Sequence, residues 1–285
     1  MVIHEIISRC IRLMRDNNSD NPIFESHIII RHCLKMQAID LVLQKNREIT
    51  PVQEKKILSV AQRRASGEPL QYILGSQEFM GLEFKVTPDV LIPRADTEIL
   101  VEYILEKYPG SKGMLALEIG TGSGCIPVSL AVYNKRAFFK AVDISEKALE
   151  VARFNAKKHN VSGHISFICS DIFSFNTSGR FDVIISNPPY IETDVIPALD
   201  KTVRDYEPIG ALDGGPDGLM FYRQIIKKAP VLLNDLGMIV FEIGYNQAEA
   251  VASLMEEHFH HIEIIKDLSG NDRVAAGTLK AKNKF

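Results

Sequence analysis

The chain has 285 residues, of which 46% are hydrophobic, and it carries a formal net charge of −3. This length allows one large domain or two smaller ones, and the hydrophobic content is sufficient for a packed core. The slightly negative charge provides no overall basic field. The composition therefore argues against a protein that binds nucleic acid nonspecifically, although it leaves room for a local basic patch.

The 4 cysteines are scattered along the chain without a C-x-x-C pair. This spacing favours reduced thiols in an intracellular protein over a disulfide framework or a zinc site. The first residues mix charged with apolar side chains and no long uncharged run follows, so neither a signal peptide nor a membrane span is expected. The expected location is the cytoplasm.

Residues 1–74 have helical patterns with no strand signal between them. Thr50 to Gln53 is typical of a helix start, because Pro51 stands at the first helical position and Gln53 can complete a capping box with Thr50. A small bundle of this kind carries no chemistry of its own. We therefore expect residues 1–74 to form a helical substrate-recognition domain.

Residues 75–95 are expected to form a β-hairpin linker, because residues 78–86 alternate apolar and polar side chains around a glycine. The remaining domain, residues 96–285, begins with a helix for which Asp96 is the expected N-cap. Strands and helices then alternate, which predicts an α/β fold with a seven-stranded Rossmann-like sheet. The expected strands are residues 114–119, 137–142, 164–169, 181–186, 238–243, 262–266 and 274–279.

A glycine-rich loop follows the first of these strands and leads into a helix. Its sequence is Gly120-Thr121-Gly122-Ser123-Gly124, and Glu118 stands just ahead of it. Glycines permit positive φ and a close approach of backbone to ligand, and the start of a helix favours a nucleotide-like group. The loop alone is a weak signal, and Glu118 could serve only to hold it in shape.

Acids follow the next two strands. Asp143 comes after Gly120 at about the spacing of a ribose-binding acid, although an acid there could also cap the helix that starts near Ser145. Asp171 and Ile172 end the third strand and are candidates to accept from an adenine amino group and to lie against its ring. Capping is again the alternative for Asp171. An acid at successive strand ends makes coincidence less probable than for either residue alone.

The apolar strand 181–186 ends in Asn187-Pro188-Pro189-Tyr190. The two prolines stiffen this turn and lack N–H groups, so it offers mainly hydrogen-bond acceptors to a ligand. A rigid pocket rich in acceptors suits a substrate NH2 group. Taken alone, however, the tetrapeptide is better explained as a strand that ends in a Pro-Pro turn.

Together, the G-T-G-S-G loop and N-P-P-Y resemble the amino-group methyltransferases that use S-adenosylmethionine. With G-E-P-L-Q-Y-I-L-G, L-I-P-R-x-x-T-E and E-P-x-x-A-L-x-G-G, the chain resembles the peptide-chain release factor glutamine methyltransferases. This resemblance implies S-adenosyl-L-methionine as cofactor and contacts to it from Glu118, Gly120, Thr121, Gly122, Ser123, Gly124, Asp143, Asp171, Ile172 and Asn187. It implies methylation of the side-chain amide (N5) of the glutamine in the Gly-Gly-Gln motif of release factors.

The chemistry of an amide fits the tetrapeptide. Its nitrogen is a poor nucleophile, so positioning must supply most of the rate. The Asn187 side-chain oxygen and the Pro188 carbonyl are expected to accept the two N–H bonds, Pro189 to line the substrate pocket, and Tyr190 to stack on the planar amide. Asn187, Pro188 and Tyr190 are thus the predicted catalytic residues. No metal is expected, and the histidines at positions 258, 260 and 261 are interpreted as helix-end cations.

Two other functions compete with this hypothesis. A nucleic-acid N6-adenine methyltransferase would use the same N-P-P-Y chemistry, and a scaffold could bind the cofactor without catalysis. The helical N-terminal region and the linker motifs favour release factors as the protein substrate over nucleic acid, and no membrane partner is expected. The scaffold is disfavoured because every expected site residue is present.

Overall fold

A computed structural model describes residues 1–17, 21–177 and 179–281, so the end of the predicted last domain, residues 282–285, lies outside it. The chain divides into two compact units. One contains Met1–Ser76 with Asp200–Tyr206, and the other Gln77–Leu199 with Glu207–Phe285. Within the ranges described, no helix has the length and apolarity needed to cross a membrane. The domain roles and the boundaries at residues 74 and 95 stay predictions.

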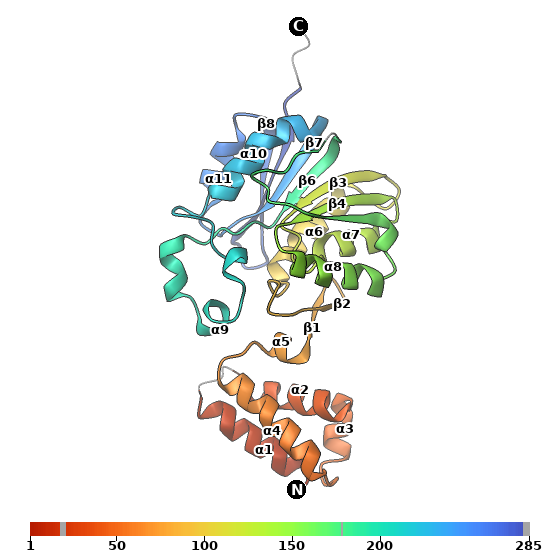
Figure 1. Cartoon of the computed structure of the whole chain (residues 1–285), viewed down its shortest axis with the longest axis vertical. Coiled ribbons are helices and arrows are strands. Elements are labelled where there is room, and N and C mark those ends of the chain that lie inside the picture. The colour runs from red at the N-terminus through yellow and green to blue at the C-terminus, as the bar shows by residue number, and fades with distance from the viewer. Residues whose placement is uncertain (18–20, 178, 282–285) are drawn as a thin grey trace. The chain divides into compact units, whose positions relative to one another are not determined.

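The first unit is helical. It contains α1 (Ile3–Arg15), α2 (Pro22–Leu34), α3 (Ala38–Leu43), α4 (Pro51–Ala65), α5 (Leu70–Leu74) and α9 (Lys201–Arg204) (Figure 1). Helices α1, α2 and α4 pack around one apolar core. The predicted capping box of α4 is confirmed, because Thr50 Oγ1 accepts from the Gln53 N–H at 3.2 Å and Gln53 Oε1 accepts from the Thr50 N–H at 2.9 Å.

Three short helices of this unit, α3, α5 and α9, were not predicted. Helix α3 starts where Asp40 reaches back to accept from the Gln37 N–H at 2.8 Å. Helix α5 lies just before the expected linker, between Pro69 and Gly75, and Gly75 ends it in the left-handed region at φ 76°. Helices of so few residues have too short a hydrophobic pattern to be recognised in sequence.

The second unit contains a seven-stranded sheet in the order β5-β4-β3-β6-β7-β9-β8, which confirms the predicted fold class. Strands β3 to β7 are parallel, and β9 runs antiparallel to both of its neighbours. The strands are β3 (Met114–Ile119), β4 (Ala137–Asp143), β5 (Ile165–Cys169), β6 (Phe181–Ser186), β7 (Leu233–Glu242), β8 (Phe259–Lys266) and β9 (Asp272–Leu279).

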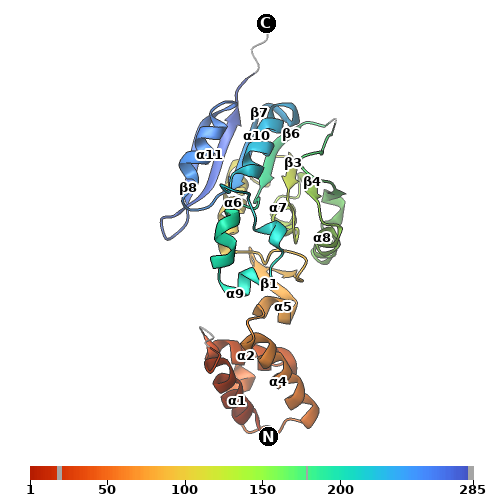
Figure 2. The same cartoon turned by 60° about the vertical axis from the view of Figure 1, so that its left-hand side comes forward.

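Helices cover both faces of this sheet (Figure 2). They are α6 (Ala95–Lys107), α7 (Cys125–Tyr133), α8 (Glu146–Lys158), α10 (Met220–Leu232) and α11 (Ala248–Met255), with short 3-10 turns at Ser162–His164, Thr193–Ala198 and Ile209–Ala211. Alternate strand residues point to opposite faces, so Ala116 packs with α6, α7 and α8, and Leu117 packs with α10 and α11. The buried central strands explain the continuous apolar runs in the sequence.

The predicted hairpin consists of β1 (Ser76–Phe79) and β2 (Leu82–Lys85). Met80 and Gly81 form its turn, and both have positive φ, at 52° and 68°. The prediction that Asp96 caps the following helix is wrong. Arg94, extended after Pro93, is the N-cap residue, and Asp96 lies in the first helical turn, where its carboxylate pairs with Arg273 Nε at 3.1 Å.

Candidate active site

A cavity of about 410 Å³ lies at the carboxyl ends of the central strands. The order of the sheet reverses between β3 and β6, and parallel sheets bind ligands at such a switch point. The cavity brings together most of the predicted site residues. They are Gly120, Thr121, Gly122, Ser123, Asp143, Asp171, Ile172, Asn187, Pro188 and Pro189.

The glycine loop adopts the expected conformation. Gly120 and Gly122 have φ of 75° and 53°, in the region that favours glycine. Gly124 does not line the cavity but begins α7, where an added Cβ would lie 3.0 Å from the Cβ of Ala152. The third glycine is thus required for packing between α7 and α8, and like the first two it has a positive φ, of 76°.

Asp143 holds the glycine loop and the following turn. Its Oδ2 accepts from the Gly122 N–H at 2.8 Å, and its Oδ1 accepts from the Ser145 N–H at 2.9 Å. The N-cap of α8 is Ser145, so the capping alternative for Asp143 is wrong. Burial raises the pKa of Asp143, and the N–H donors of Ser145 and Gly122 act against that rise. Its contact with a ribose stays a prediction.

Asp171 and Ile172 lie just after β5, as expected from the sequence. Asp171 Oδ1 accepts from the Phe173 N–H at 2.9 Å, and this bond closes a turn. No helix begins there, so Asp171 is not a helix cap. The side chain of Ile172 is buried in the cavity wall. Both residues can therefore contact a ligand, and their roles toward adenine stay predictions.

Glu118 lies behind the glycine loop with its side chain fully buried, at 0% exposure. The Thr121 hydroxyl donates to its Oε2 at 2.5 Å, while its Oε1 has no hydrogen-bond partner among the residues described. Burial raises the pKa of Glu118 to about 8. A buried acceptor without a partner is costly, and such atoms are often completed by a ligand.

Asn187 follows β6, and its Nδ2 donates to Thr97 Oγ1 at 3.3 Å. Pro188 is buried, whereas Asn187 and Pro189 are half-buried in the cavity wall. Tyr190 is not among the cavity-lining residues, because its ring packs against the core under α10 and α11. Its predicted stacking on a substrate is therefore the part of the site with the least structural support.

Sequence reasoning missed three polar residues near the cavity. Arg94 and Thr97 line it, and Arg94 Nη2 pairs with the buried Glu207 Oε1 at 2.5 Å. Both belong to the L-I-P-R-x-x-T-E motif, which was a signal for a role in the site. Glu242, at the end of β7, is 2% exposed, and burial raises its pKa to about 7 while the side chains of Thr97 and Asn187 act against that rise. The predicted strand 238–243 places Glu242 inside the strand, so the pattern of acids that follow strands did not indicate it.

Metal binding has no support in the part of the chain that is described, which contains no group of three His, Cys, Asp or Glu residues able to hold an ion. The histidines expected at a helix end are differently placed. Only His258 lies just beyond α11, whereas His260 and His261 belong to β8. The helix-end interpretation is wrong for these two because β8 starts earlier than its hydrophobic pattern indicated.

Comparison with known proteins identifies the family. A profile described as "PrmC N-terminal domain" matches residues 5–75, and one described as "Methyltransferase domain" matches residues 110–275. A release factor glutamine methyltransferase of Fusobacterium nucleatum is 39% identical over 98% of this chain and 80% of its own length. One of Moorella thermoacetica is 37% identical over 96% of this chain and 97% of its own length. This chain belongs to the release factor glutamine methyltransferase family.

The fold agrees with solved structures. A crystal structure of a methyltransferase from Pyrococcus furiosus covers 71% of this chain and 91% of its own length, with a TM-score of 0.52 and 22% identity. At this identity the likeness shows the fold alone. Family membership confirms the resemblance seen in the sequence, the methyltransferase class and S-adenosyl-L-methionine as cofactor.

The residues present fit this cofactor. The cavity lies within the size range of small-molecule sites and has the glycine loop and two acids in its wall. Glu118 is fully buried and is not among the cavity-lining residues, so it supports the glycine loop from behind through Thr121, and its contact with the cofactor stays a prediction. Asp143 and Asp171 offer acceptors for hydroxyl and amino groups, and Ile172 offers an apolar surface for a ring.

Proposed function

We propose that this chain methylates the side-chain amide (N5) of the glutamine in the Gly-Gly-Gln motif of peptide-chain release factors, with S-adenosyl-L-methionine as methyl donor. One observation carries the proposal beyond family membership. The glycine loop and the Asn187-Pro188-Pro189 turn, which are far apart in the sequence, line the same cavity. Cofactor and methyl acceptor can therefore meet in one cavity.

The residues of the turn would act by orientation. Asn187 uses its side-chain nitrogen on Thr97, so its Oδ1 is available to accept an N–H of the substrate amide. The Pro188 carbonyl would accept the second N–H, and the two acceptors would meet positive charge that develops on the nitrogen. When bound, S-adenosyl-L-methionine supplies the methyl group, and the amide nitrogen loses one proton to solvent. The roles of these residues are part of the proposal.

The choice of release factors over nucleic acid rests on the named relatives and on physical grounds. An exposed Gly-Gly-Gln segment can enter a pocket bordered by prolines, whereas a base in a duplex must first be flipped out at a cost of a few kcal/mol. The net charge of −3 also gives little help in binding phosphates. Nucleic acid is therefore not proposed as a substrate, and the proposed location is the cytoplasm, where release factors act.

The test is to incubate the purified protein with radiolabelled S-adenosylmethionine and, separately, a release factor, its Gln-to-Ala variant, total RNA and DNA. Peptide mass spectrometry then locates the label. We expect label on the wild-type release factor and none on its Ala variant. Label on adenine with none on the release factor would replace the proposal with the nucleic-acid alternative.

A further inference from the structure

The side chain of asparagine has two different ends, and the proposed function requires a particular one to face the substrate. Its nitrogen only donates hydrogen bonds and its oxygen only accepts them. A substrate NH2 group can be bound by the oxygen but not by the nitrogen. The residues around the buried end of Asn187 therefore decide whether it can act.

Three chain segments meet at this point. Ser186 of β6 pairs with Phe241 of β7 in parallel register, so the next residues, Asn187 and Glu242, come side by side at the carboxyl ends of the two strands. Thr97 joins them from the first turn of α6. Thr97 and Glu242 are each 2% exposed, so their polar atoms depend on one another for hydrogen bonds.

The hydrogen bonds run in one direction. Asn187 Nδ2 donates to Thr97 Oγ1 at 3.3 Å, and the side chains of Thr97 and Asn187 act against the rise that burial causes in the pKa of the neighbouring Glu242. An ionised carboxylate only accepts hydrogen bonds, so Glu242 in this form selects the nitrogen end of Asn187 and leaves the oxygen end to the cavity. A reversed amide would place its oxygen against the acceptors of Glu242.

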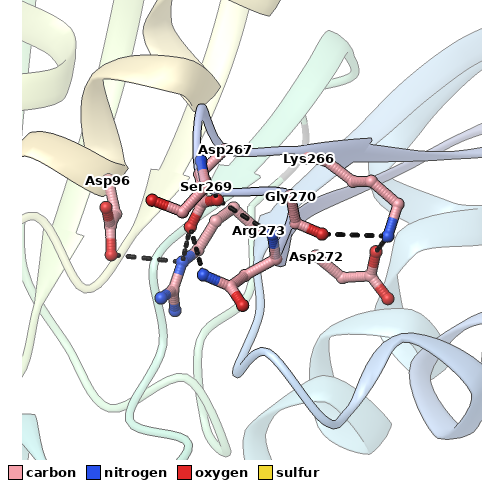
Figure 3. Close-up of polar contacts among 8 residues, drawn as sticks. Asp96, Lys266, Asp267, Ser269, Gly270, Asp272 and Arg273 are labelled. Carbon is pink, nitrogen blue, oxygen red and sulfur yellow. Dashed lines mark hydrogen bonds and ion pairs between the residues drawn. The ribbon is translucent and has the colours of Figure 1, made fainter.

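The nearby cation does not form an ion pair with Glu242 that would compete with Asn187 and Thr97. Arg273 is the cation that faces it, but the Arg273 Nε pairs with Asp96 and Asp267, at 3.1 Å each (Figure 3). Glu242 Oε2 is buried and has no hydrogen-bond partner among the described residues. A buried carboxylate with an unpartnered oxygen is an expensive way to stabilise a fold, because an apolar side chain of similar size would cost less.

We propose that Thr97 and Glu242 are positioning residues, which hold the Asn187 side chain with its oxygen toward the methyl acceptor. This inference rests on the proposed function. It adds two residues that act on the methyl acceptor through Asn187 and not by a hydrogen bond of their own to it.

The test compares paired variants. Thr97→Val keeps the shape but loses the hydroxyl, and Glu242→Met removes the acceptor, so in each we expect kcat for the release factor to fall at least about tenfold. Thr97→Ser and Glu242→Gln keep an oxygen acceptor and should retain most of the wild-type kcat. KM for the release factor and calorimetric affinity for the cofactor should change much less than kcat. Glu249→Gln on the exposed surface of α11 is the matched control.

Thermal unfolding separates positioning from stability. Glu242→Met removes an unpartnered buried oxygen but also takes an acceptor away from Thr97 and Asn187, so its unfolding temperature should stay close to that of the wild type while its kcat is reduced. A role in stability alone would instead lower the unfolding temperature and leave kcat of the folded protein unchanged. Wild-type kcat in both Thr97→Val and Glu242→Met would overturn the inference.

A measurement without substrate distinguishes failure of this inference from failure of the proposed function. In protein labelled with ¹⁵N-asparagine, the side-chain NH2 signal of Asn187, assigned by its loss in Asn187→Ala, should be protected from exchange with water. Protection should be lost in Thr97→Val and kept in Thr97→Ser. If wild-type protein failed to methylate the release factor, the proposed function would fall while this result still decided the orientation of Asn187. Equal exchange in the wild type and in Thr97→Val would overturn the inference.

Discussion

At the scale of single residues, the site combines one fixed amide with several buried acids. Asn187 is half-buried in the wall of the cavity, with its nitrogen held by Thr97. Glu118, Asp143 and Glu242 all have raised pKa values because they are buried. Each of these side chains either has an oxygen without a hydrogen-bond partner or holds a loop in place. Its role can therefore be tested by a separate substitution.

Asn187→Ala should abolish most methyl transfer. The oxygen of Asn187 is expected to contact charge that grows in the transition state, and the loss of one such contact costs about 3 kcal/mol, or about a hundredfold in kcat. Single-turnover kinetics with the release factor measures this change, and circular dichroism confirms folding. A variant with wild-type kcat would remove Asn187 from the mechanism.

Asp143→Ala should weaken cofactor binding about tenfold or more while the protein still folds. The variant loses the acceptor that holds the Gly122 N–H, and with it the proposed contact to ribose hydroxyls. Calorimetric titration with S-adenosylmethionine measures the affinity, with Asp235→Ala on the surface as control. Unchanged affinity in folded protein would leave the carboxylate with no part in cofactor binding.

Glu118 predicts a pH dependence of stability. Its pKa of about 8 in the folded protein lies above the ordinary value of 4.5, so its contribution is present below the lower value and is lost as pH rises through the higher one. Without cofactor, the unfolding temperature should fall between about pH 5 and about pH 8.5, and Glu118→Gln should reduce this fall by a few degrees. Differential scanning calorimetry at the two pH values tests it. An equal fall in both proteins would show that Glu118 is not the group that titrates.

At the scale of elements, a second loop supports the Asn187-Pro188-Pro189-Tyr190 turn. The Gly214 N–H donates to the Ile191 carbonyl at 2.8 Å, and the Ile191 N–H donates to the Leu212 carbonyl at 3.0 Å. Gln247 Nε2 donates to the Tyr190 carbonyl at 3.0 Å. The turn is therefore held along its backbone as well as by its prolines.

Gly218 makes this packing possible, so Gly218→Ala should displace the turn. An added Cβ would collide with the Tyr190 carbonyl oxygen and lie 2.6 Å from Gln247 Nε2, and the φ of 69° is itself unfavourable for alanine. Displacement of the proposed acceptors, the Asn187 side-chain oxygen and the Pro188 carbonyl, should lower kcat about a hundredfold. Gly163→Ala, where nothing lies within 4 Å of the added Cβ, is the matched control. Wild-type kcat in Gly218→Ala would show that the turn does not depend on this loop.

At the scale of the whole molecule, chemistry and the helical bundle occupy different units. The cavity is lined only by residues of the unit that contains the sheet. The helical unit also includes a late segment, Asp200–Tyr206, in which the Tyr206 hydroxyl donates to the Ser66 carbonyl at 3.3 Å. The bundle is thus joined to the catalytic part of the chain at more than one point in the sequence.

Removal of residues 1–76 should leave cofactor binding intact but abolish methylation of the release factor, because the cavity keeps all its lining residues while the proposed recognition domain is lost. Calorimetry and the radiolabel assay measure the two activities. In a full-length control, a glycine-serine linker replaces residues 200–206, which tests whether that segment alone causes the loss. Wild-type methylation by the truncated protein would refute the recognition role.

The local features of the fold were readable from sequence. Thr50 and Gln53 predicted the start of α4, and the apolar run before Asn187 predicted β6, because capping and strand patterns involve neighbouring residues. Short helices such as α3, and the true N-cap of α6, escaped because weak local signals are decided by packing.

The sequence by itself determined the family, the seven-stranded α/β fold and most of the loops that line the cavity, since each rests on a contiguous motif. Only the tertiary structure decided how these loops work together. The register of β6 and β7 places Glu242 beside Asn187. Ser145, and not Asp143, caps α8, and Tyr190 packs against the core. The reason is physical: a hydrogen bond between residues far apart in the chain depends on strand register and side-chain direction, and neither is written in a local pattern.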